Sequence, residues 1–325
     1  MEMKKIVVLL LWLGACVAAE KSSIGAWLAM TPWEAREKIN QSIMRIPAQE
    51  YAVAAVKDQV ITVDNRTTPV RIYSPPKSGA LPAILFIHGG AWIAGNIDTH
   101  DNLARYFCAQ AEAVVVSVGY TNSPEGKFPL PLQQCFDALC WLEKNAGEIS
   151  VDVSCIAIVG DSAGGNMAAA LCLMARDLCG PKISLQVLIN PAPDLTCGGS
   201  LEIQGETFLD VMRWQAREYV SNSADVNNAY VSPLVAKDLT QLPKAVVILA
   251  EQDALREDGQ KYADRLKKAG NAVEVYTQFG IGHLAGHGAR AAEHAQPSLL
   301  VAQKALKACF EQQAQDSPAT SVKSV

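Results

Sequence analysis

The chain alternates between short, almost wholly apolar runs and longer stretches in which apolar residues recur at helical spacing. Uninterrupted apolar runs are typical of parallel strands that are buried on both faces of a sheet. Ahead of these runs, Lys57–Val63 and Val70–Tyr73 flank the turn-forming sequence Asp64-Asn65-Arg66 and predict a hairpin. The pattern therefore predicts an α/β fold with about eight strands in an open, mostly parallel sheet, with helices on both faces. The runs predicted as parallel strands are Ala83–His88, Val114–Val118, Cys155–Gly160, Leu185–Asn190, Ala245–Glu251 and Val273–Phe279.

Two helical segments interrupt this alternation. Thr31-Pro32-Trp33-Glu34 supplies an N-cap, a proline at the first helical position and a capping-box glutamate for an amphipathic helix that runs toward Arg45. The second segment runs from Thr196 to Tyr219. Because long insertions between sheet elements are often functional covers, we expect a small helical cap from residues 24–50 and 196–225, within one domain over residues 20–315. Ordinary packing helices are the alternative.

The sequences at the two ends of the chain predict a signal peptide and a disordered tail, not parts of the folded domain. Lys4 and Lys5 precede an apolar run and then small residues up to Ala19, which is the layout of a secretory signal peptide over residues 1–19. The run is too short to span a bilayer comfortably. Cleavage after Ala19 or at a lipobox-like site before Cys16 both remain open, and the second would tether the protein to a membrane surface through lipid on Cys16. We expect an exported protein, periplasmic or extracellular, and a disordered tail over residues 316–325.

Composition narrows the classes of function. Half of the 325 residues are hydrophobic, and 33 acidic against 28 basic residues give a net charge of −5. This composition excludes an intrinsically disordered chain and gives no electrostatic drive toward nucleic acid. The nine cysteines contain no C-x-x-C pair, so no zinc ribbon or redox pair is indicated, and disulfide pairing stays open. No metal-ligand spacing or P-loop appears, and the G-x-G-x-x-A match at Gly280 is followed by too little chain for a dinucleotide fold, so we expect no cofactor and no metal.

One motif carries the candidate chemistry. Gly160-Asp161-Ser162-Ala163-Gly164-Gly165 lies between a predicted strand and a helical run over Asn166–Ala175, and it fits the pattern G-x-S-x-G. A serine on such a sharp turn has strained backbone angles, so Gly160 and Gly164 beside it must be small. The helix that follows points its N-terminus at the serine and favours negative charge there. Ser162 is the predicted nucleophile; a chance match in a glycine-rich turn is the alternative.

A serine hydroxyl attacks poorly until a base removes its proton, so a histidine and an orienting carboxylate are required. Asp253 follows the strand Ala245–Glu251, and His283 follows the last predicted strand. The order Ser, Asp, His is the one that accompanies a nucleophile elbow, and each residue follows the end of a different strand. We therefore predict that Ser162, Asp253 and His283 meet in one crevice.

Rival residues exist for two of these roles. Glu251 and Asp258 are alternatives for the acid, but Glu251 is expected to end a strand and Asp258 to begin a helix. His287 and His294 are alternatives for the base, but they lie farther past the strand end, toward a solvated helix. The placement favours Asp253 and His283.

Attack on a carbonyl creates an oxyanion, which requires preorganised N–H donors. His88-Gly89-Gly90-Ala91-Trp92 follows the strand Ala83–His88, and its glycines let backbone amides approach the developing charge. Gly89 and Gly90, together with Ala163 after the nucleophile, are the predicted donors. His88 precedes the donors, so we expect it to support the loop rather than to act as a second base.

These motifs together resemble the hormone-sensitive-lipase-like branch of the α/β-hydrolase fold, a group of bacterial esterases and related deacetylases, over most of the chain. The resemblance implies a metal-free hydrolase of short- to medium-chain carboxylic esters with a cap made from the N-terminal region and a later insertion. An amidase or deacetylase on the same triad, and a non-catalytic binding protein on the same scaffold, remain alternatives. The residues that carry the resemblance are His88-Gly89-Gly90, Tyr120 to Glu125 with Phe128-Pro129, Gly160 to Asn166, Ser232-Pro233-Leu234, Leu242-Pro243 and Glu257-Asp258-Gly259.

The chain departs from the pattern of this branch at three places. Ala91 stands where many members have a third glycine, which puts bulky tertiary-alcohol esters in doubt. Asp253-Ala254-Leu255 lacks the usual proline, and His283-Leu284-Ala285 lacks the usual Gly-Phe. No reacting group is lost, so these departures affect the expected shape of the pocket rather than the reaction.

Overall fold

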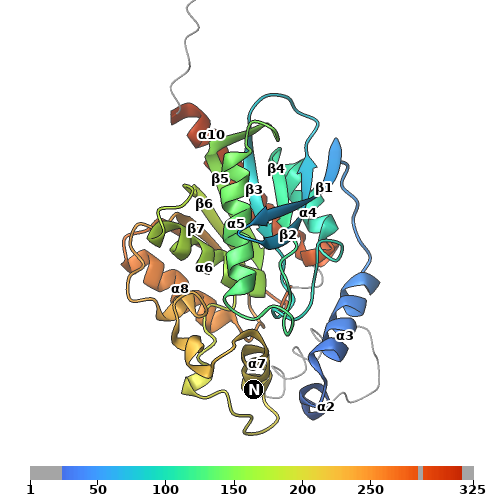
Figure 1. Ribbon diagram of the computed structural model, residues 1–325, viewed down its shortest axis with the longest axis vertical. Helices are drawn as coiled ribbons and strands as arrows, with labels where there is room; N and C mark the ends of the chain where they lie inside the picture. The colour runs from blue at the N-terminus through green and yellow to red at the C-terminus, as the bar shows by residue number, and fades with distance from the viewer. Residues whose placement is uncertain (1–23, 285–287, 317–325) are drawn as a thin grey trace, which may run out of the picture.

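The computed structural model describes residues 24–284 and 288–316 (Figure 1). The predicted signal segment with Cys16, and tail residues 317–325, lie outside the described residues. The described chain forms one sheet of eight strands in the order β1-β2-β4-β3-β5-β6-β7-β8. Strands β3 to β8 pair in parallel, whereas β1 and β2 run antiparallel to their neighbours, so the predicted mostly parallel sheet is confirmed. The strands are β1 (Ala55–Val63), β2 (Arg66–Ser74), β3 (Leu81–Ile87), β4 (Val114–Val118), β5 (Val151–Asp161), β6 (Leu185–Ile189), β7 (Lys244–Ala250) and β8 (Val273–Gln278).

The predicted hairpin is present, but its second strand is longer than expected. Asp64 and Asn65 have positive φ angles of 47° and 62°, as the two central residues of a tight hairpin turn require. Because this turn uses only two residues, Arg66 already pairs with Val63. The assignment of Arg66 to the turn was therefore wrong: β2 begins there and not at Val70.

Helices cover both faces of the sheet (Figure 1). The helices α5, α6 and α8 bury their apolar residues in one large core, and α4 and α10 bury theirs in a second core on the opposite face. Strand residues alternate between the two cores, so Leu85 faces one core and Phe86 faces the other. These helices are α4 (Asp101–Ala111), α5 (Leu130–Lys144), α6 (Ala163–Asp177), α8 (Arg256–Lys268) and α10 (Gln296–Asp316).

A third apolar cluster joins the two segments that we expected to form a cap. It brings together α2 (Ile24–Leu28), α3 (Pro32–Arg45) and α7 (Phe208–Tyr219). The rings of Trp27 on α2 and Trp214 on α7 meet edge to face, with centroids 6.3 Å apart. Figure 1 shows α2, α3 and α7 together below the sheet, at the end where β5 and β7 stop. We call this group the cap cluster; its buried residues on the three helices are Ile24, Trp27, Ala35, Ile39, Ile43, Val211 and Trp214.

Helix α3 is fastened to the body of the protein by Arg36. Its guanidinium binds the carboxylate of Glu125, and it also donates to the carbonyl oxygens of Ile93 (2.6 Å) and Ser123 (2.6 Å). One turn later, the Asn40 side chain accepts a hydrogen bond of 2.8 Å from the N–H of Gly95. These bonds attach the N-terminal helix to the loops that follow β3 and β4, and the first of these loops also contributes to the site described below.

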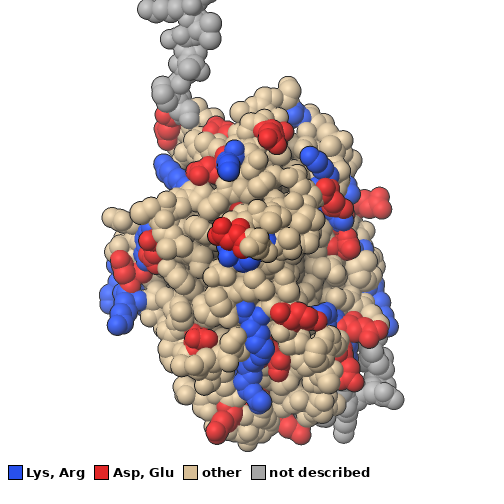
Figure 2. Space-filling view, viewed as in Figure 1, with Lys and Arg blue, Asp and Glu red and all other residues tan. Residues whose placement is uncertain are grey.

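The surface charges and the cysteines do not narrow the possible functions further. Acidic and basic side chains are interspersed over the face drawn in Figure 2. Among the described residues, no helix is long and apolar enough to cross a membrane. The eight cysteines of the described ranges are all free thiols, and burial raises the pKa of Cys108 and Cys197 to about 12. Buried thiols of this kind behave as small hydrophobic residues.

Candidate active site

Ser162 occupies a sharp turn between β5 and α6. Its φ and ψ angles of 54° and −117° lie outside the regions that most residues adopt. A Cβ atom on Gly160 would overlap the carbonyl oxygen of Gly164, and one on Gly164 would overlap the carbonyl oxygens of Ile87 and His88. The two glycines therefore allow the turn to form, and the turn presents the serine hydroxyl at the end of the sheet.

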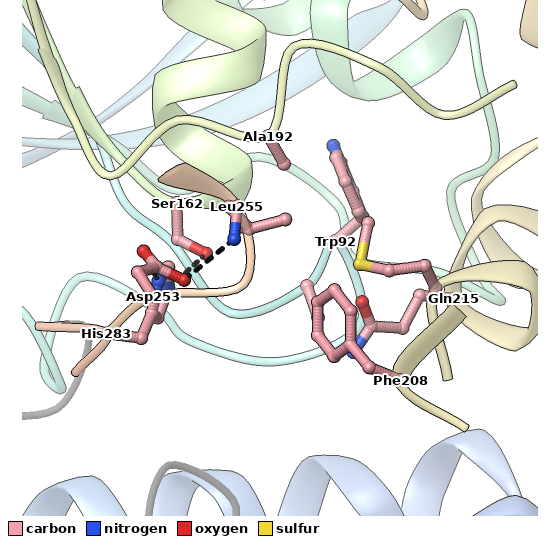
Figure 3. A pocket seen from close by; sticks show the side chains of 10 residues that line it. Trp92, Ser162, Ala192, Phe208, Gln215, Asp253, Leu255 and His283 are labelled. Carbon is pink, nitrogen blue, oxygen red and sulfur yellow. Dashed lines mark hydrogen bonds and ion pairs between the residues drawn. The ribbon is translucent and has the colours of Figure 1, made fainter. Parts of the chain in front are cut away.

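The structure brings Ser162, His283 and Asp253 into contact (Figure 3). His283 Nε2 lies 3.0 Å from Ser162 Oγ, and His283 Nδ1 lies 2.6 Å from Asp253 Oδ2. The other carboxylate oxygen of Asp253 accepts the N–H of Leu255 at 3.0 Å, which fixes the orientation of the acid. The side chains of His283 and Asp253 are 7% and 3% exposed, so the pair is largely shielded from water. This chain of contacts can move a proton from the serine to the imidazole while the carboxylate holds the ring.

The rival residues have other partners. The carboxylate of Glu251 accepts the N–H of Gly280 at 2.8 Å, and the carboxylate of Asp258 binds Lys261 one turn along α8. His294 lies in the short helix η4 (Glu293–Ala295), where its carbonyl oxygen accepts from the Gln278 side chain. His287 lies outside the described residues. The geometry therefore singles out Asp253 and His283.

The loop after β3 corrects one of the predicted oxyanion donors. The N–H of Gly89 donates to the buried carboxylate of Asp161 at 3.0 Å, so this amide is already used inside the protein. Within the described part of the chain, the N–H groups of Gly90, Ala91 and Ala163 donate to no protein acceptor. Ala91 lines the pocket beside Ser162. The geometry thus moves the donor set from Gly89, Gly90 and Ala163 to Gly90, Ala91 and Ala163, and Gly89 becomes an anchor of the loop.

His88 lies under this loop and away from the serine. Its Nδ1 is 2.8 Å from the carbonyl oxygen of Gly89, and its ring stacks on Tyr120 at 4.2 Å. The Tyr120 hydroxyl donates to the His88 carbonyl at 2.9 Å. Burial, reinforced by the neighbouring His100, lowers the pKa of His88 to about 3. A histidine that stays neutral and packed in this way supports the loop but is not placed to act on a substrate.

A narrow cavity opens next to Ser162, and its free volume of about 20 Å³ is close to the space that one water molecule needs. Its wall comes from the loops after β3, β6, β7 and β8 and from helix α7 of the cap cluster. A pocket of this size suits a small substrate rather than a bulky one. Among the described residues, no group of three or more His, Cys, Asp or Glu side chains could hold a metal ion. The lining residues are Ala91, Trp92, Ser162, Ala192, Phe208, Met212, Gln215, Asp253, Leu255 and His283.

Comparison with known proteins identifies the family. A family model described as alpha/beta hydrolase fold matches residues 84–286, which is more than half of the chain. The chain belongs to the α/β-hydrolase family. This α/β-hydrolase is similar to an arylesterase from Saccharolobus solfataricus, at 38% identity over 73% of this chain and 78% of the relative. It is 32% identical to an ethyl acetate hydrolase from Pseudomonas putida, over 77% of this chain and 81% of the relative.

A solved structure agrees with these relatives. The hyperthermophilic esterase from the archaeon Pyrobaculum calidifontis has a TM-score of 0.77 and 34% identity, and the match covers 86% of this chain and 94% of that one. The predicted fold and the predicted hormone-sensitive-lipase-like branch are therefore confirmed.

Proposed function

We propose that this α/β-hydrolase is a serine carboxylesterase that hydrolyses short- to medium-chain acyl esters. The observation that carries the proposal is the chain of contacts from Ser162 Oγ to His283 Nε2 (3.0 Å) and from His283 Nδ1 to Asp253 Oδ2 (2.6 Å). The contacts open onto a small, mostly apolar pocket. The printed names of the relatives, an arylesterase and an ethyl acetate hydrolase, support an ester as the substrate.

The first half of the reaction forms an acyl-enzyme. Ser162 Oγ attacks the ester carbonyl while His283 Nε2 takes the hydroxyl proton, and Asp253 stabilises the imidazolium. The carbonyl electrons move to oxygen, and the amides of Gly90, Ala91 and Ala163 stabilise the oxyanion. When the tetrahedral intermediate collapses, His283 returns the proton to the departing alcohol, and the acyl group remains on Ser162.

The second half releases the acid. His283 takes a proton from a water molecule, which attacks the acyl-serine carbonyl and forms a second oxyanion at the same amides. Collapse of this intermediate breaks the bond to Ser162 Oγ, and the proton on His283 returns to the serine. The pocket limits the length of the acyl or alcohol group that can be enclosed during these steps.

The proposal is tested by replacing the nucleophile. Ser162→Ala should lower kcat for nitrophenyl butanoate by about 10⁴-fold or more, because triad members act as a unit. Ser154→Ala is the matched control, since Ser154 lies on the same strand β5 and binds Asp152 (2.7 Å). A fluorophosphonate should add its mass to the peptide that contains Ser162 and to no other. Activity of Ser162→Ala within tenfold of the wild-type value would overturn the proposal.

Substrate class is tested by two further series. A series of nitrophenyl esters from acetate to palmitate should show kcat/KM falling once the acyl chain exceeds what the pocket encloses. A preference for long-chain emulsions would indicate a lipase instead. Nitroanilides of the same acids test the amidase alternative, because amide hydrolysis requires His283 to protonate a poorer leaving group.

We also propose that the protein is exported. The support is the pattern of the first nineteen residues, with basic, apolar and then small positions in order. Mass spectrometry of the mature protein from cells separates the two cleavage sites. A chain that starts at Glu20 indicates ordinary signal peptidase, and a chain that starts at a lipid-modified Cys16 indicates a membrane-tethered form. An uncleaved Met1 would refute export by either route.

A further inference from the structure

The apolar pocket contains one amide side chain. Gln215 on α7 lines the cavity together with the triad and with Phe208, and it is only 3% exposed. Figure 3 shows its side chain reaching from helix α7 toward the triad, with the amide beside the ring of Phe208. Within the described part of the chain, Gln215 Nε2 has no hydrogen-bond acceptor.

The two buried charged residues on the same helix have partners, whereas the hydroxyl of Tyr219 at the end of the helix also lacks one among the described residues. The carboxylate of Asp210 accepts hydrogen bonds from the N–H groups of Gln204 and Thr207 and from Arg213. Arg213 also donates to the carbonyl of Ser200 at 3.2 Å. An unpaired buried N–H is unfavourable, whereas a methionine or leucine would fill the same space without that penalty. Gln215 therefore places a donor where the protein itself supplies no acceptor, at the wall that a bound substrate would touch.

We infer that Gln215 is a specificity-determining residue that donates a hydrogen bond to a second oxygen of the substrate, beyond the ester that is cleaved. The preferred substrates are then esters that carry an ether, hydroxyl or carbonyl oxygen a few atoms from the scissile carbonyl. This inference rests on the proposed esterase function. A purely hydrocarbon chain of the same length fills the pocket but leaves the Gln215 amide unpaired, and sites built to pair with a polar group reject analogues that lack it.

The experiment compares two esters of equal length. Nitrophenyl methoxyacetate differs from nitrophenyl butanoate by an oxygen in place of one methylene group. The ratio of their kcat/KM values is divided by the ratio of their hydroxide-catalysed rate constants, which removes the intrinsic reactivity of the two esters. For the wild-type enzyme, the corrected ratio should exceed one by about fivefold to tenfold, the size of effect expected for one hydrogen bond.

Variants locate the preference at Gln215. Gln215→Met keeps the volume but removes the donor, so it should bring the corrected ratio to one or below. Met212→Leu is the matched control from the same helix and the same pocket, and it should change both kcat/KM values together and leave the ratio at the wild-type level. Thermal melting checks that each variant is folded.

A second arm shows which half of the substrate carries the oxygen. Butyl butanoate and 2-methoxyethyl butanoate differ only on the alcohol side, and acid release from each is followed by titration. A preference in either pair that Gln215→Met abolishes supports the inference. A corrected wild-type ratio of one or below in both pairs overturns it, even if no variant folds, and so does a preference that survives in Gln215→Met. Rapid hydrolysis of all four esters without preference would leave the esterase proposal intact, whereas hydrolysis of none would refute both.

Discussion

Replacing Asp161 by asparagine removes the charge that holds the loop after β3, which carries the oxyanion donors Gly90 and Ala91, in place. The carboxylate accepts the N–H of Gly89 at 3.0 Å, and its other oxygen lies 3.4 Å from His100 Nε2. Asp161 immediately precedes Ser162, so it links the nucleophile turn to the loop that carries Gly90 and Ala91. An asparagine side chain can still accept the hydrogen bond from Gly89 through its oxygen, but it carries no charge. Toward His100 it presents either an NH2 donor or a carbonyl oxygen, which is a weaker acceptor than a carboxylate.

The size of the effect follows from the bond that is weakened. A hydrogen bond to a charged group contributes about 1.5–3 kcal/mol, and Asp161 is only 3% exposed, so solvent does not screen the interaction. Asparagine still offers Gly89 a neutral hydrogen bond of about 0.5–1.5 kcal/mol, so about 1–1.5 kcal/mol is lost. If this loss appears as poorer placement of the oxyanion donors, about 1.4 kcal/mol for each factor of ten gives a decrease in kcat of about 5- to 12-fold. KM should change little, because Asp161 does not line the pocket.

Steady-state kinetics with nitrophenyl butanoate measures both constants. Asp137→Asn is the matched control, since Asp137 is also buried and accepts two hydrogen bonds from Arg66 (2.9 and 3.1 Å) away from the site. It should lower the unfolding free energy without lowering kcat. If kcat of Asp161→Asn stays within twofold of the Asp137→Asn value, the anchoring role of Asp161 is wrong.

Three further predictions concern stability. Gly164→Ala should lower the unfolding free energy by about 2 kcal/mol or more in urea titrations, because the added Cβ would overlap the carbonyl oxygens of Ile87 and His88. Gly147→Ala is the control: its Cβ meets open space, so the unfolding free energy should change by less than about 0.5 kcal/mol. Hydrogen bonds from Arg36 lower the pKa of Glu125 to about 2 from its ordinary value of 4.5, so the contribution of this carboxylate to stability is fully present above pH 4.5 and is lost as pH falls through 2. The stability difference from Glu125→Gln, about 1 kcal/mol for this half-exposed pair, should therefore shrink between about pH 4.5 and pH 2. Burial lowers the pKa of His88 to about 3, so the unfolded chain binds a proton below about pH 6.5 that the native state excludes, and stability should fall with decreasing pH by up to about 1.4 kcal/mol per unit. Urea titrations at several pH values should show this slope reduced in His88→Gln, and equal slopes would contradict the assignment.

Much of the fold was predictable because the pattern of apolar residues in the sequence shows directly which segments are buried. Strands such as Val114–Val118 are buried on both faces, and their uninterrupted apolar runs show this. The start of β1 was less visible, since Ala55 and Val56 are exposed at the edge of the sheet and carry no periodic signal. The start of β2 depended on the number of residues in the hairpin turn, which the residue types around Asp64 do not determine by themselves.

The site was predictable where chemistry fixes the residue type and topology fixes the place. Ser162, Asp253 and His283 each follow a strand end, and the parallel sheet brings those ends together. The partner of the Gly89 amide was not predictable, because it depends on which direction one N–H points. Gln215 was also missed, since its place beside Trp214 suggests a polar helix face, whereas α7 is enclosed on both sides by the cap cluster and the pocket.

The cap cluster can form only late during synthesis, because it joins helices from distant parts of the sequence. Helices α2 and α3 leave the ribosome before any strand, whereas their partner α7 is synthesised only after six strands. Until then Trp27 and Ile39 have no Trp214 to cover them, and exposed apolar surface of this kind invites aggregation or chaperone binding. A nascent chain halted before Phe208 would already contain the serine but would lack the side of the pocket that α7 supplies.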